Sequence, residues 1–473
     1  MTSLRLRDGA RRLFPLAWPV FLGQIAVLAF STADTVMIAR TSATDLAALA
    51  IGSAAYISVF VGLMGVVLAI GPIAGQLFGA GKLRETGHEA HQAMWLALAL
   101  SVVGCALLLF PQPFLSLARA DGEVADKARS YLTGLAFALP PALVFTACRG
   151  FNIAVSRPKA VMALQLGALM LKVPLNAVFI FGARLATPLG ALQIQPQGTP
   201  GCAIATAIVM SVQLVAMLIL MRRDPFYARF GLGSRWSRPR RASLSALIGL
   251  GVPMGLSILI EVTGFTFMAF FISRIGATAV AGHQIAVNMV SMMFMLPLAI
   301  ANASSTLVAQ RVGAGDAADA RHVGWAGLEI GVLIATVLGG VVYVFRSELV
   351  GLYTTDAVIV GAAVPLLAWA GLFHIADAAQ TISAFVLRAY RIATVPLVIY
   401  GLAIWVVGLG GGYAVAFDLF GISPSALLGA QGFWSMATLG VALAAVGMTS
   451  FLAWVLRRER RASPAFSEAA TRS

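Results

Sequence analysis

The stretch LGVPMGLSILIEVTGFTFMAFFIS, residues 250–273, decides the fold. It belongs to an apolar run between Arg241 and Arg274, and Glu261, near the middle, is the only charged side chain in that run. About 20 consecutive apolar residues are long enough to cross the hydrocarbon core of a bilayer as a helix. The stretch therefore predicts a membrane-spanning helix.

Glu261 is costly at that position, because a carboxylate at the bilayer centre costs about 3 kcal/mol or more on insertion scales. We therefore expect its side chain to face the protein interior or a water-filled cavity, which makes it a candidate functional residue. The alternative is a protonated Glu261 that only hydrogen-bonds to a neighbouring helix.

The composition of the whole chain fits a membrane protein. Of 473 residues, 59% are hydrophobic and 11% are charged, and the mean hydropathy is +0.89, which excludes a soluble globular domain. The net charge of +14 does not predict a nucleic-acid partner, because Lys and Arg occur in short blocks between apolar runs. Cys105, Cys148 and Cys202 lie in apolar segments without metal-ligand spacing, so neither a disulfide framework nor a zinc site is expected.

Charges and turn residues divide the chain into twelve predicted membrane spans. Their approximate bounds are 14–39, 47–79, 91–111, 130–152, 160–183, 199–221, 245–273, 277–304, 324–345, 360–386, 393–416 and 429–456. Twelve spans place both termini on one side. That side carries 25 Lys and Arg against seven on the other, so the positive-inside rule predicts cytoplasmic termini.

The two halves of the chain repeat each other. A shift of 234 residues aligns Pro19 with Pro253, Arg40 with Arg274, and Gln76-x-x-Gly-Ala-Gly with the same pattern at Gln310. Because each half holds six spans, the repeats run parallel. We expect an all-α polytopic protein: an N-terminal six-helix lobe (1–221), a cytoplasmic linker (222–244), a C-terminal six-helix lobe (245–456) and a disordered cytoplasmic tail (457–473).

Other titratable residues lie inside the spans: Asp34, Lys172, His283, His374 and Asp377. Two carboxylates in one lobe, Glu261 and Asp377, suit a Na⁺ site completed by hydroxyls such as that of Thr263. They equally suit a proton carrier, and charge pairing within the lobe, for example with His374, is a third possibility. Na⁺ bound by Glu261 and Asp377 is the only metal ion that the sequence predicts.

Several of these residues, and a group of Met and Phe side chains, could serve structure and not function. His374 and Asp377 are spaced i, i+3 on one helix face, which favours a local hydrogen bond. Lys172 is expected to have a structural role, by snorkelling or by pairing with a carboxylate. Met289, Met292, Met293 and Phe294 are candidates for an adaptable ligand cavity, although such residues more often pack or face lipid.

Several motifs together resemble the multidrug and toxic compound extrusion (MATE) family, in its bacterial NorM-like branch. The motifs are Ala33-Asp34-Thr35-Val36-Met37, Gln76-Leu77-Phe78-Gly79-Ala80-Gly81, Pro174-Leu175-Asn176, Gly201-Cys202-Ala203-Ile204-Ala205-Thr206-Ala207, Glu261-Val262-Thr263, His283-Gln284-Ile285-Ala286-Val287-Asn288, Asp377-Ala378-Ala379-Gln380 and Leu387-Arg388-Ala389-Tyr390. The resemblance covers nearly the whole chain, and its specificity comes from the combination.

The resemblance implies which residues form the sites. Asp34, with Asn176 and Thr206, is similar to the family's N-lobe protonation site, and Glu261 with Asp377 is similar to its C-lobe cation site. Supporting polar residues are Thr263, His283, Asn288, His374 and Gln380. Some relatives have an aromatic hydroxyl four residues before the C-lobe aspartate, where this chain has Phe373. That ring could face a cation, but it offers no oxygen to Na⁺, which favours H⁺.

The resemblance also implies the function. We expect a monomeric multidrug efflux antiporter of the bacterial inner membrane, not an enzyme, that exports cationic amphipathic drugs or dyes in exchange for H⁺ or Na⁺ by alternating access. Beyond that ion it needs no cofactor, and membrane lipid is its other partner. The sequence has no GxxxxGK[ST] motif, so we expect no ATP coupling.

Three alternatives stay open. A lipid-linked precursor flippase or a small-metabolite exporter would belong to the same superfamily, but a flippase would be expected to carry more intramembrane cations than Lys172. A channel or receptor would belong to another class. The scattered arrangement of carboxylates argues against the ring of charges that lines a pore.

Overall fold

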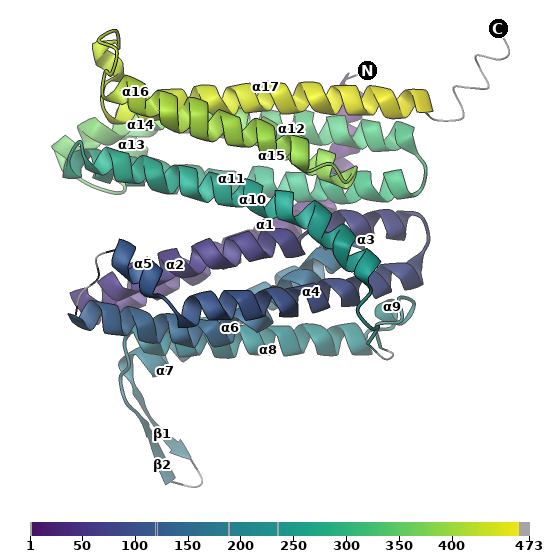
Figure 1. The fold of residues 1–473 in the computed structure, drawn as a ribbon, viewed down its shortest axis with the longest axis horizontal. Coiled ribbons are helices and arrows are strands. Elements are labelled where there is room, and N and C mark those ends of the chain that lie inside the picture. The colour runs from purple at the N-terminus through teal and green to yellow at the C-terminus, as the bar shows by residue number, and fades with distance from the viewer. Residues whose placement is uncertain (1, 119, 121, 188–189, 234–235, 463–473) are drawn as a thin grey trace, which may run out of the picture. The chain divides into compact units, whose positions relative to one another are not determined.

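The computed structural model describes residues 2–118, 120, 122–187, 190–233 and 236–462 (Figure 1). It confirms the all-α polytopic fold, with twelve helical segments long and apolar enough to cross a membrane in the described part of the chain. Residues 463–473 of the predicted disordered tail lie outside the described residues. The first residues of that tail, 457–462, belong to the last helix, which ends at Ala462.

The elements of the first half are α1 (Thr2–Ile38), α2 (Ala43–Val67), α3 (Ile70–Gly79), α4 (Leu83–Leu109), α5 (Gln112–Leu117), α6 (Gly122–Ala154), α7 (Pro158–Phe181), β1 (Ala183–Thr187), β2 (Gly190–Ile194), α8 (Thr199–Arg223) and α9 (Pro225–Ala228). Together α2 and α3 make one span, Ala43–Gly79. The strands pair antiparallel with Ala183 opposite Ile194, and Figure 1 shows this hairpin projecting away from the helices, below α7 and α8 in that view. The sequence patterns described above did not predict this hairpin.

The elements of the second half are α10 (Arg241–Ser273), α11 (Ala277–Gly313), α12 (Ala317–Val344), α13 (Arg346–Gly351), α14 (Ala357–Ala389), α15 (Thr394–Gly401), the π-helical segment η1 (Leu402–Gly411), α16 (Gly412–Ala416), the 3₁₀ turn η2 (Ser425–Leu427) and α17 (Ala430–Ala462). Here α15, η1 and α16 make one span, Thr394–Ala416. A Cβ on Gly440 of α17 would lie 2.4 Å from the carbonyl oxygen of Ala403, so glycine lets these helices pack closely.

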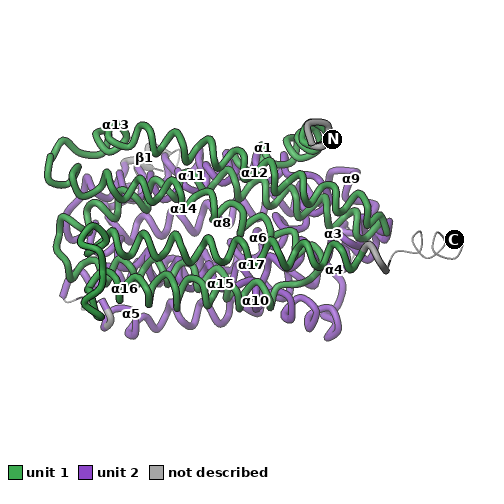
Figure 2. Tube along the Cα trace, turned by 90° about the horizontal axis from the view of Figure 1, so that it is seen from above, with its two compact units in different colours: residues 1–21, 256–473 green, residues 22–255 purple. Residues whose placement is uncertain are grey.

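Contacts divide the chain into two compact units, shown in different colours in Figure 2. Unit 1 comprises residues 1–21 and 256–473, and unit 2 comprises residues 22–255. Both divisions fall inside helices, in α1 and in α10, whereas the sequence analysis placed them on either side of the linker 222–244. The first part of α1 therefore belongs with the second half of the chain, and the first part of α10 belongs with the first half.

Local packing explains where α10 is divided. A Cβ on Gly251 would lie 2.3 Å from the carbonyl oxygen of Val66, and one on Gly255 would lie 2.6 Å from that of Gly62. Only glycine allows this approach of two backbones, so the start of α10 packs against α2 within unit 2.

Charges hold the start of α1 in unit 1. Arg12 donates two hydrogen bonds to the carboxylate of Asp319 on α12, at 2.7 and 2.6 Å, and Arg311 on α11 contacts the same carboxylate at 2.8 Å. Such bidentate pairs combine geometric specificity with strength. The first turns of α1 are therefore fixed to α11 and α12.

The linker between α8 and α10 packs against α4 in unit 2. The ring of Trp236 lies edge-on to that of Trp95, with centroids 5.5 Å apart, and Gln92 exchanges hydrogen bonds with the backbone at Arg238 and Arg240. In its described residues the linker is therefore held by specific contacts along α4.

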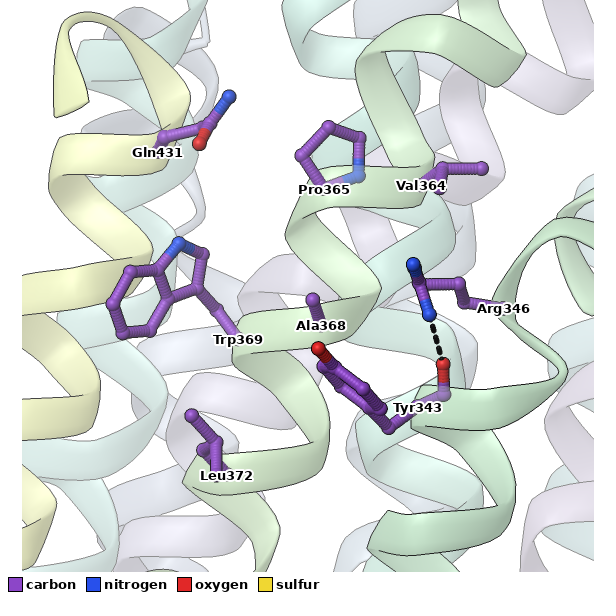
Figure 3. Close-up of a pocket in the computed structure, with 8 residues that line it drawn as sticks. All are labelled: Tyr343, Arg346, Val364, Pro365, Ala368, Trp369, Leu372 and Gln431. Carbon is purple, nitrogen blue, oxygen red and sulfur yellow. Dashed lines mark hydrogen bonds between the residues drawn. The ribbon is translucent and has the colours of Figure 1, made fainter. Parts of the chain in front are cut away.

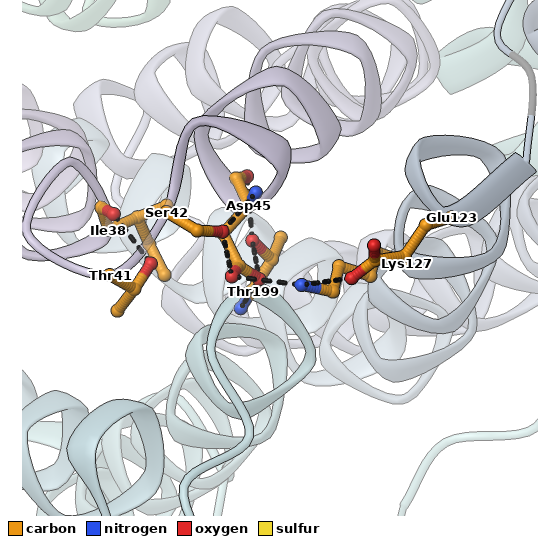
Figure 4. Close-up of polar contacts among 7 residues, drawn as sticks. All are labelled: Ile38, Thr41, Ser42, Asp45, Glu123, Lys127 and Thr199. Carbon is orange, nitrogen blue, oxygen red and sulfur yellow. Dashed lines mark hydrogen bonds and ion pairs between the residues drawn. The ribbon is translucent and has the colours of Figure 1, made fainter.

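Asp45 joins three helices of unit 2 at one end of the bundle (Figure 4). Its carboxylate accepts hydrogen bonds from Ser42, the N-cap of α2, at 2.6 Å, from Lys127 on α6 at 3.0 Å, and from the backbone N–H of Thr199 on α8 at 3.1 Å. Only 5% of Asp45 is exposed. Gly198 is at φ +57°, and a Cβ there would lie 2.4 Å from the carboxylate, so the turn before α8 requires glycine.

We predict that Asp45→Asn destabilises the protein by about 1–3 kcal/mol, because it removes the buried carboxylate that accepts from Ser42, Lys127 and Thr199, while Lys127 keeps only its pair with the exposed Glu123 at 2.9 Å. The measurement is the thermal unfolding of the purified protein in detergent, where a clearly lower midpoint is expected. The control is Asp126→Asn, which removes an exposed pair with Arg129 at 3.7 Å and should cost less than about 1 kcal/mol. Equal midpoints for the two variants would contradict this assignment.

Candidate functional site

In unit 2 a polar cluster joins α1 and α7. The side-chain amide of Asn176 donates a hydrogen bond to Oδ1 of Asp34 at 2.6 Å. Asn176 is fully buried, and the Asp34 side chain keeps 14% of its surface exposed. Two of the residues predicted for the N-lobe site are therefore in direct contact, and Asp34 is the part of the cluster that a ligand could reach.

Lys172 links this cluster to α8. Its ammonium lies 3.0 Å from Oδ1 of Asp34 and also donates to the hydroxyl of Thr206 and, at 3.5 Å, to the carbonyl oxygen of Cys202. Thr206 thus reaches Asp34 through Lys172. The lysine is fully buried, so it pairs with a carboxylate and does not snorkel. Its spacing of four residues from Asn176, which puts both on one helix face, was the signal that could have assigned it to the site.

In unit 1 the second cluster is built on α10 and α14. Asp377 is 3% exposed, and its Oδ1 accepts a hydrogen bond from the amide of Gln380 at 3.0 Å, which also contacts the hydroxyl of Thr381 at 2.9 Å. Glu261 on α10 lies within electrostatic range of Asp377. The two predicted C-lobe carboxylates therefore share one site.

Two further residues of this cluster could not be assigned to it from the sequence. The hydroxyl of Tyr400 on α15 lies within hydrogen-bonding range of Glu261, and Arg388 is close enough to Glu261 for an electrostatic interaction. Arg388 follows Asp377 by eleven residues, about three helical turns, so both occupy one face of α14. Tyr400 lies in an apolar run on another helix, where the local sequence carries no signal for it.

The two histidines do not join the carboxylates. His283 is 1% exposed and accepts a hydrogen bond from the indole N–H of Trp434 at 3.2 Å, in the core of unit 1. His374 is fully buried, and neither ring nitrogen has a hydrogen-bond partner among the described residues. The expected bond between His374 and Asp377 is therefore not formed, because an i, i+3 spacing brings two residues to one face without fixing the directions of their side chains.

Thr263 and Asn288 make other contacts. The Thr263 hydroxyl donates to the carbonyl oxygens of Leu259 at 2.5 Å and Ile260 at 3.3 Å, so it is turned back on its own helix. The side-chain oxygen of Asn288 accepts a hydrogen bond from the hydroxyl of Tyr353 at 2.8 Å, in an exposed position.

The predicted apolar cavity residues point in different directions around α11. Met293 is buried in the core of unit 1, Met289 is partly buried against that core, Phe294 is half-buried, and Met292 is 50% exposed. Phe373 is also in the core, where its ring contacts Phe265 and Trp434 edge-on with centroids 5.9 and 6.0 Å apart. These positions fit packing better than a shared ligand surface.

A groove of about 420 Å³ lies elsewhere in unit 1 (Figure 3). It is lined by Tyr343, Arg346, Val364, Pro365, Ala368, Trp369, Leu372 and Gln431. Arg346 donates to the carbonyl oxygen of Tyr343 and stacks over its ring, 4.8 Å from the centroid. None of the lining residues was predicted for the site.

The family model described as MatE matches residues 19–178 and 253–414. The chain belongs to the MatE family. The resemblance inferred from the motifs is thereby confirmed. Members of this family are transporters, so this chain is a multi-pass membrane transporter and not an enzyme. Asp34, Lys172, Asn176, Glu261 and Asp377 all lie in the matched residues, and Thr206 lies between the two matched segments.

Curated relatives of this MatE chain match along nearly all of its length. A probable multidrug resistance protein NorM of Aromatoleum aromaticum is 37% identical over 449 residues, covering 95% of each chain. The multidrug resistance protein PmpM of Pseudomonas aeruginosa is 31% identical, covering 96% of this chain and 94% of the relative. A crystal structure of the Vibrio cholerae MATE transporter VcmN in the bent form has a TM-score of 0.83 at 19% identity, covering 96% and 99%, so the fold is shared.

We predict that Gln380→Leu destabilises this MatE chain by about 1–3 kcal/mol, because the buried Asp377 loses its hydrogen-bond donor. Thr263→Val is the matched control, since it removes a hydroxyl that serves only the backbone of its own helix, and it should change stability by less than about 1 kcal/mol. Thermal unfolding in detergent compares the two. A larger loss for Thr263→Val would assign to Thr263 a contact that this geometry does not give it.

Proposed function

We propose that this MatE chain is a multidrug efflux antiporter of the bacterial inner membrane. It exports cationic amphipathic compounds in exchange for protons, by alternating access of its two units. The observation that carries the proposal is that each unit of a transporter of this family holds a polar cluster with at least one intramembrane carboxylate: Asp34 in unit 2, and Glu261 with Asp377 in unit 1. Carboxylates are the groups that exchange a cationic ligand for a proton.

The names of the relatives support export of several drugs. NorM of Aromatoleum aromaticum and PmpM of Pseudomonas aeruginosa both carry multidrug resistance in their printed names. Transport of this kind needs no cofactor other than the ion gradient. The excess of Lys and Arg on one side of the spans supports cytoplasmic termini, and we propose that the chain works as a monomer, with its six-helix lobes moving largely as rigid bodies.

The choice of protons over Na⁺ rests on the surroundings of the C-terminal cluster. Phe373 offers no oxygen at the position four residues before Asp377, and the Thr263 hydroxyl is turned to its own backbone. Arg388 brings a positive charge towards Glu261, which opposes binding of a second cation beside it. A proton needs only the carboxylates, whereas Na⁺ requires several oxygen ligands.

A flippase for lipid-linked precursors is less well supported. Such a protein needs free cationic side chains to hold phosphate groups inside the membrane. Lys172, the clear intramembrane cation in the sequence, is fully buried and paired with Asp34. It is therefore not available to a phosphate.

Efflux of a cationic dye from proteoliposomes, driven separately by a pH gradient and by a Na⁺ gradient, tests the proposal. We expect the pH gradient alone to drive saturable efflux. The substitutions Asp34→Asn, Glu261→Gln and Asp377→Asn should each lower the rate about tenfold or more, because each removes an exchangeable charge. Efflux that all three substitutions leave intact would refute the mechanism, and efflux driven only by Na⁺ would refute the choice of protons.

We further predict that Tyr400→Phe lowers efflux several-fold, because Glu261 loses the hydroxyl that lies beside it. Tyr413→Phe is the matched control, since the Tyr413 ring packs between Phe271 and Phe417, with centroids 5.0 and 4.8 Å away, and its contacts are those of the ring. The same dye assay measures both variants at equal protein content. Equal efflux by Tyr400→Phe and the unmodified protein would show that the hydroxyl is dispensable.

A further inference from the structure

Lys172 is a fully buried ammonium whose contacts are all supplied by the protein. An ammonium group has three N–H donors. Here they meet Oδ1 of Asp34 at 3.0 Å, the hydroxyl of Thr206, and the carbonyl oxygen of Cys202 at 3.5 Å. The ammonium also lies over the ring of Phe30, 5.1 Å from its centroid. A charge inside the membrane needs such complete solvation by the protein.

The pair presents only its negative partner to a ligand. Asp34 keeps 14% of its side chain exposed, whereas Lys172 has no exposed surface. A cation that approaches Asp34 therefore meets a carboxylate whose inner oxygen is already shared by an ammonium and by the amide of Asn176. The formal charge of the pair is zero, so the attraction it exerts on a cation several ångströms away is that of a dipole and not of a full charge.

The cluster in unit 1 has a different charge balance. Glu261 and Asp377 are two carboxylates, and Arg388 is the cation within range of Glu261. Fully ionised, these three groups carry a formal charge of −1, against zero for Asp34 with Lys172. The two clusters of one chain therefore differ in how strongly they can hold a positive ligand.

We propose that Lys172 is a specificity-determining residue of the Asp34 site: a built-in counter-ion that weakens the hold of this site on singly charged cations. The inference rests on the proposed function, because it concerns the cations that the transporter exports. A cation at Asp34 must compete with a lysine that cannot diffuse away. Strong binding of the positive ligand is left to the carboxylates of unit 1, and the Asp34 site releases such a ligand readily.

The test is equilibrium binding of tetraphenylphosphonium, a permanently charged monovalent cation, to the full-length protein in lipid nanodiscs at pH 8. Each form is also measured with Glu261→Gln and Asp377→Asn added, so that the Kd of the Asp34 site is resolved from that of the unit 1 site. The variants are Lys172→Met, Lys172→Gln, Asp34→Asn and the double variant Lys172→Met with Asp34→Asn. Removing the counter-ion should lower the Kd at least about tenfold, the effect of one unbalanced charge several ångströms away at an effective dielectric near 20. Asp34→Asn leaves the Lys172 ammonium without a negative partner, so the Kd should rise. The double variant should bring the Kd back close to that of the unmodified protein.

Opposite shifts for the two single substitutions and their cancellation in the double variant distinguish a charge effect from a role in packing. A lysine that only fills space predicts weaker binding, or no change, in every variant, and that result would overturn the proposal. It would also be rejected if neither Lys172 variant folds while the double variant does, because the pair would then serve stability alone. A protein that binds and exports no cation in any form would refute the proposed function itself, which separates the two failures.

Discussion

The dominant constraint on this structure is that a charged group in hydrocarbon must be solvated by the protein itself. Lys172 shows how far the constraint reaches, because one ammonium engages side chains or backbone from α1 and α8. The same requirement gathers Gln380 and Thr381 beside Asp377 on α14. The buried charges therefore have polar partners, which come from other helices for Lys172 and from the same helix for Asp377.

The sequence repeat does not produce the same interactions at the starts of α1 and α10. The first part of α1 and the first part of α10 are equivalent under the shift of 234 residues, and each belongs to the unit that holds the other half of the chain. Yet α10 is held by glycines at 251 and 255 that admit a neighbouring backbone, whereas α1 is held by the bidentate pair of Arg12 and Asp319. The attachment of α1 therefore adds a charged pair to close packing at Gly9, where a Cβ would lie 2.6 Å from that of Ala326 on α12. The common requirement is that both helices are anchored at their starts, and it has been met by different chemistry.

Much of the fold could be predicted from the sequence, because hydrophobic runs of membrane length are a strong signal and charges interrupt them sharply. The carboxylates could be predicted for the same reason, since Asp34, Glu261 and Asp377 stand out against apolar neighbours. The residues that surround these carboxylates could not be predicted. Tyr400 is one aromatic residue among many apolar ones, and only the packing of α15 brings its hydroxyl to Glu261.

Spacing along a helix was a useful but incomplete guide. It could have placed Lys172 beside Asn176, yet it wrongly favoured a bond between His374 and Asp377, because the final direction of a side chain depends on its rotamer and its neighbours. The division of the chain inside α1 and α10 likewise could not be predicted, since it depends on contacts between residues far apart in sequence.

Charge balance connects these observations to mechanism. A carboxylate identified from sequence is only half of a site, because its partner decides whether it acts as a full charge or as part of a dipole. For Asp34 that partner is the buried ammonium of Lys172, and for Glu261 it is a second carboxylate, an arginine and a tyrosine hydroxyl, so similar acids in one chain are prepared for different tasks.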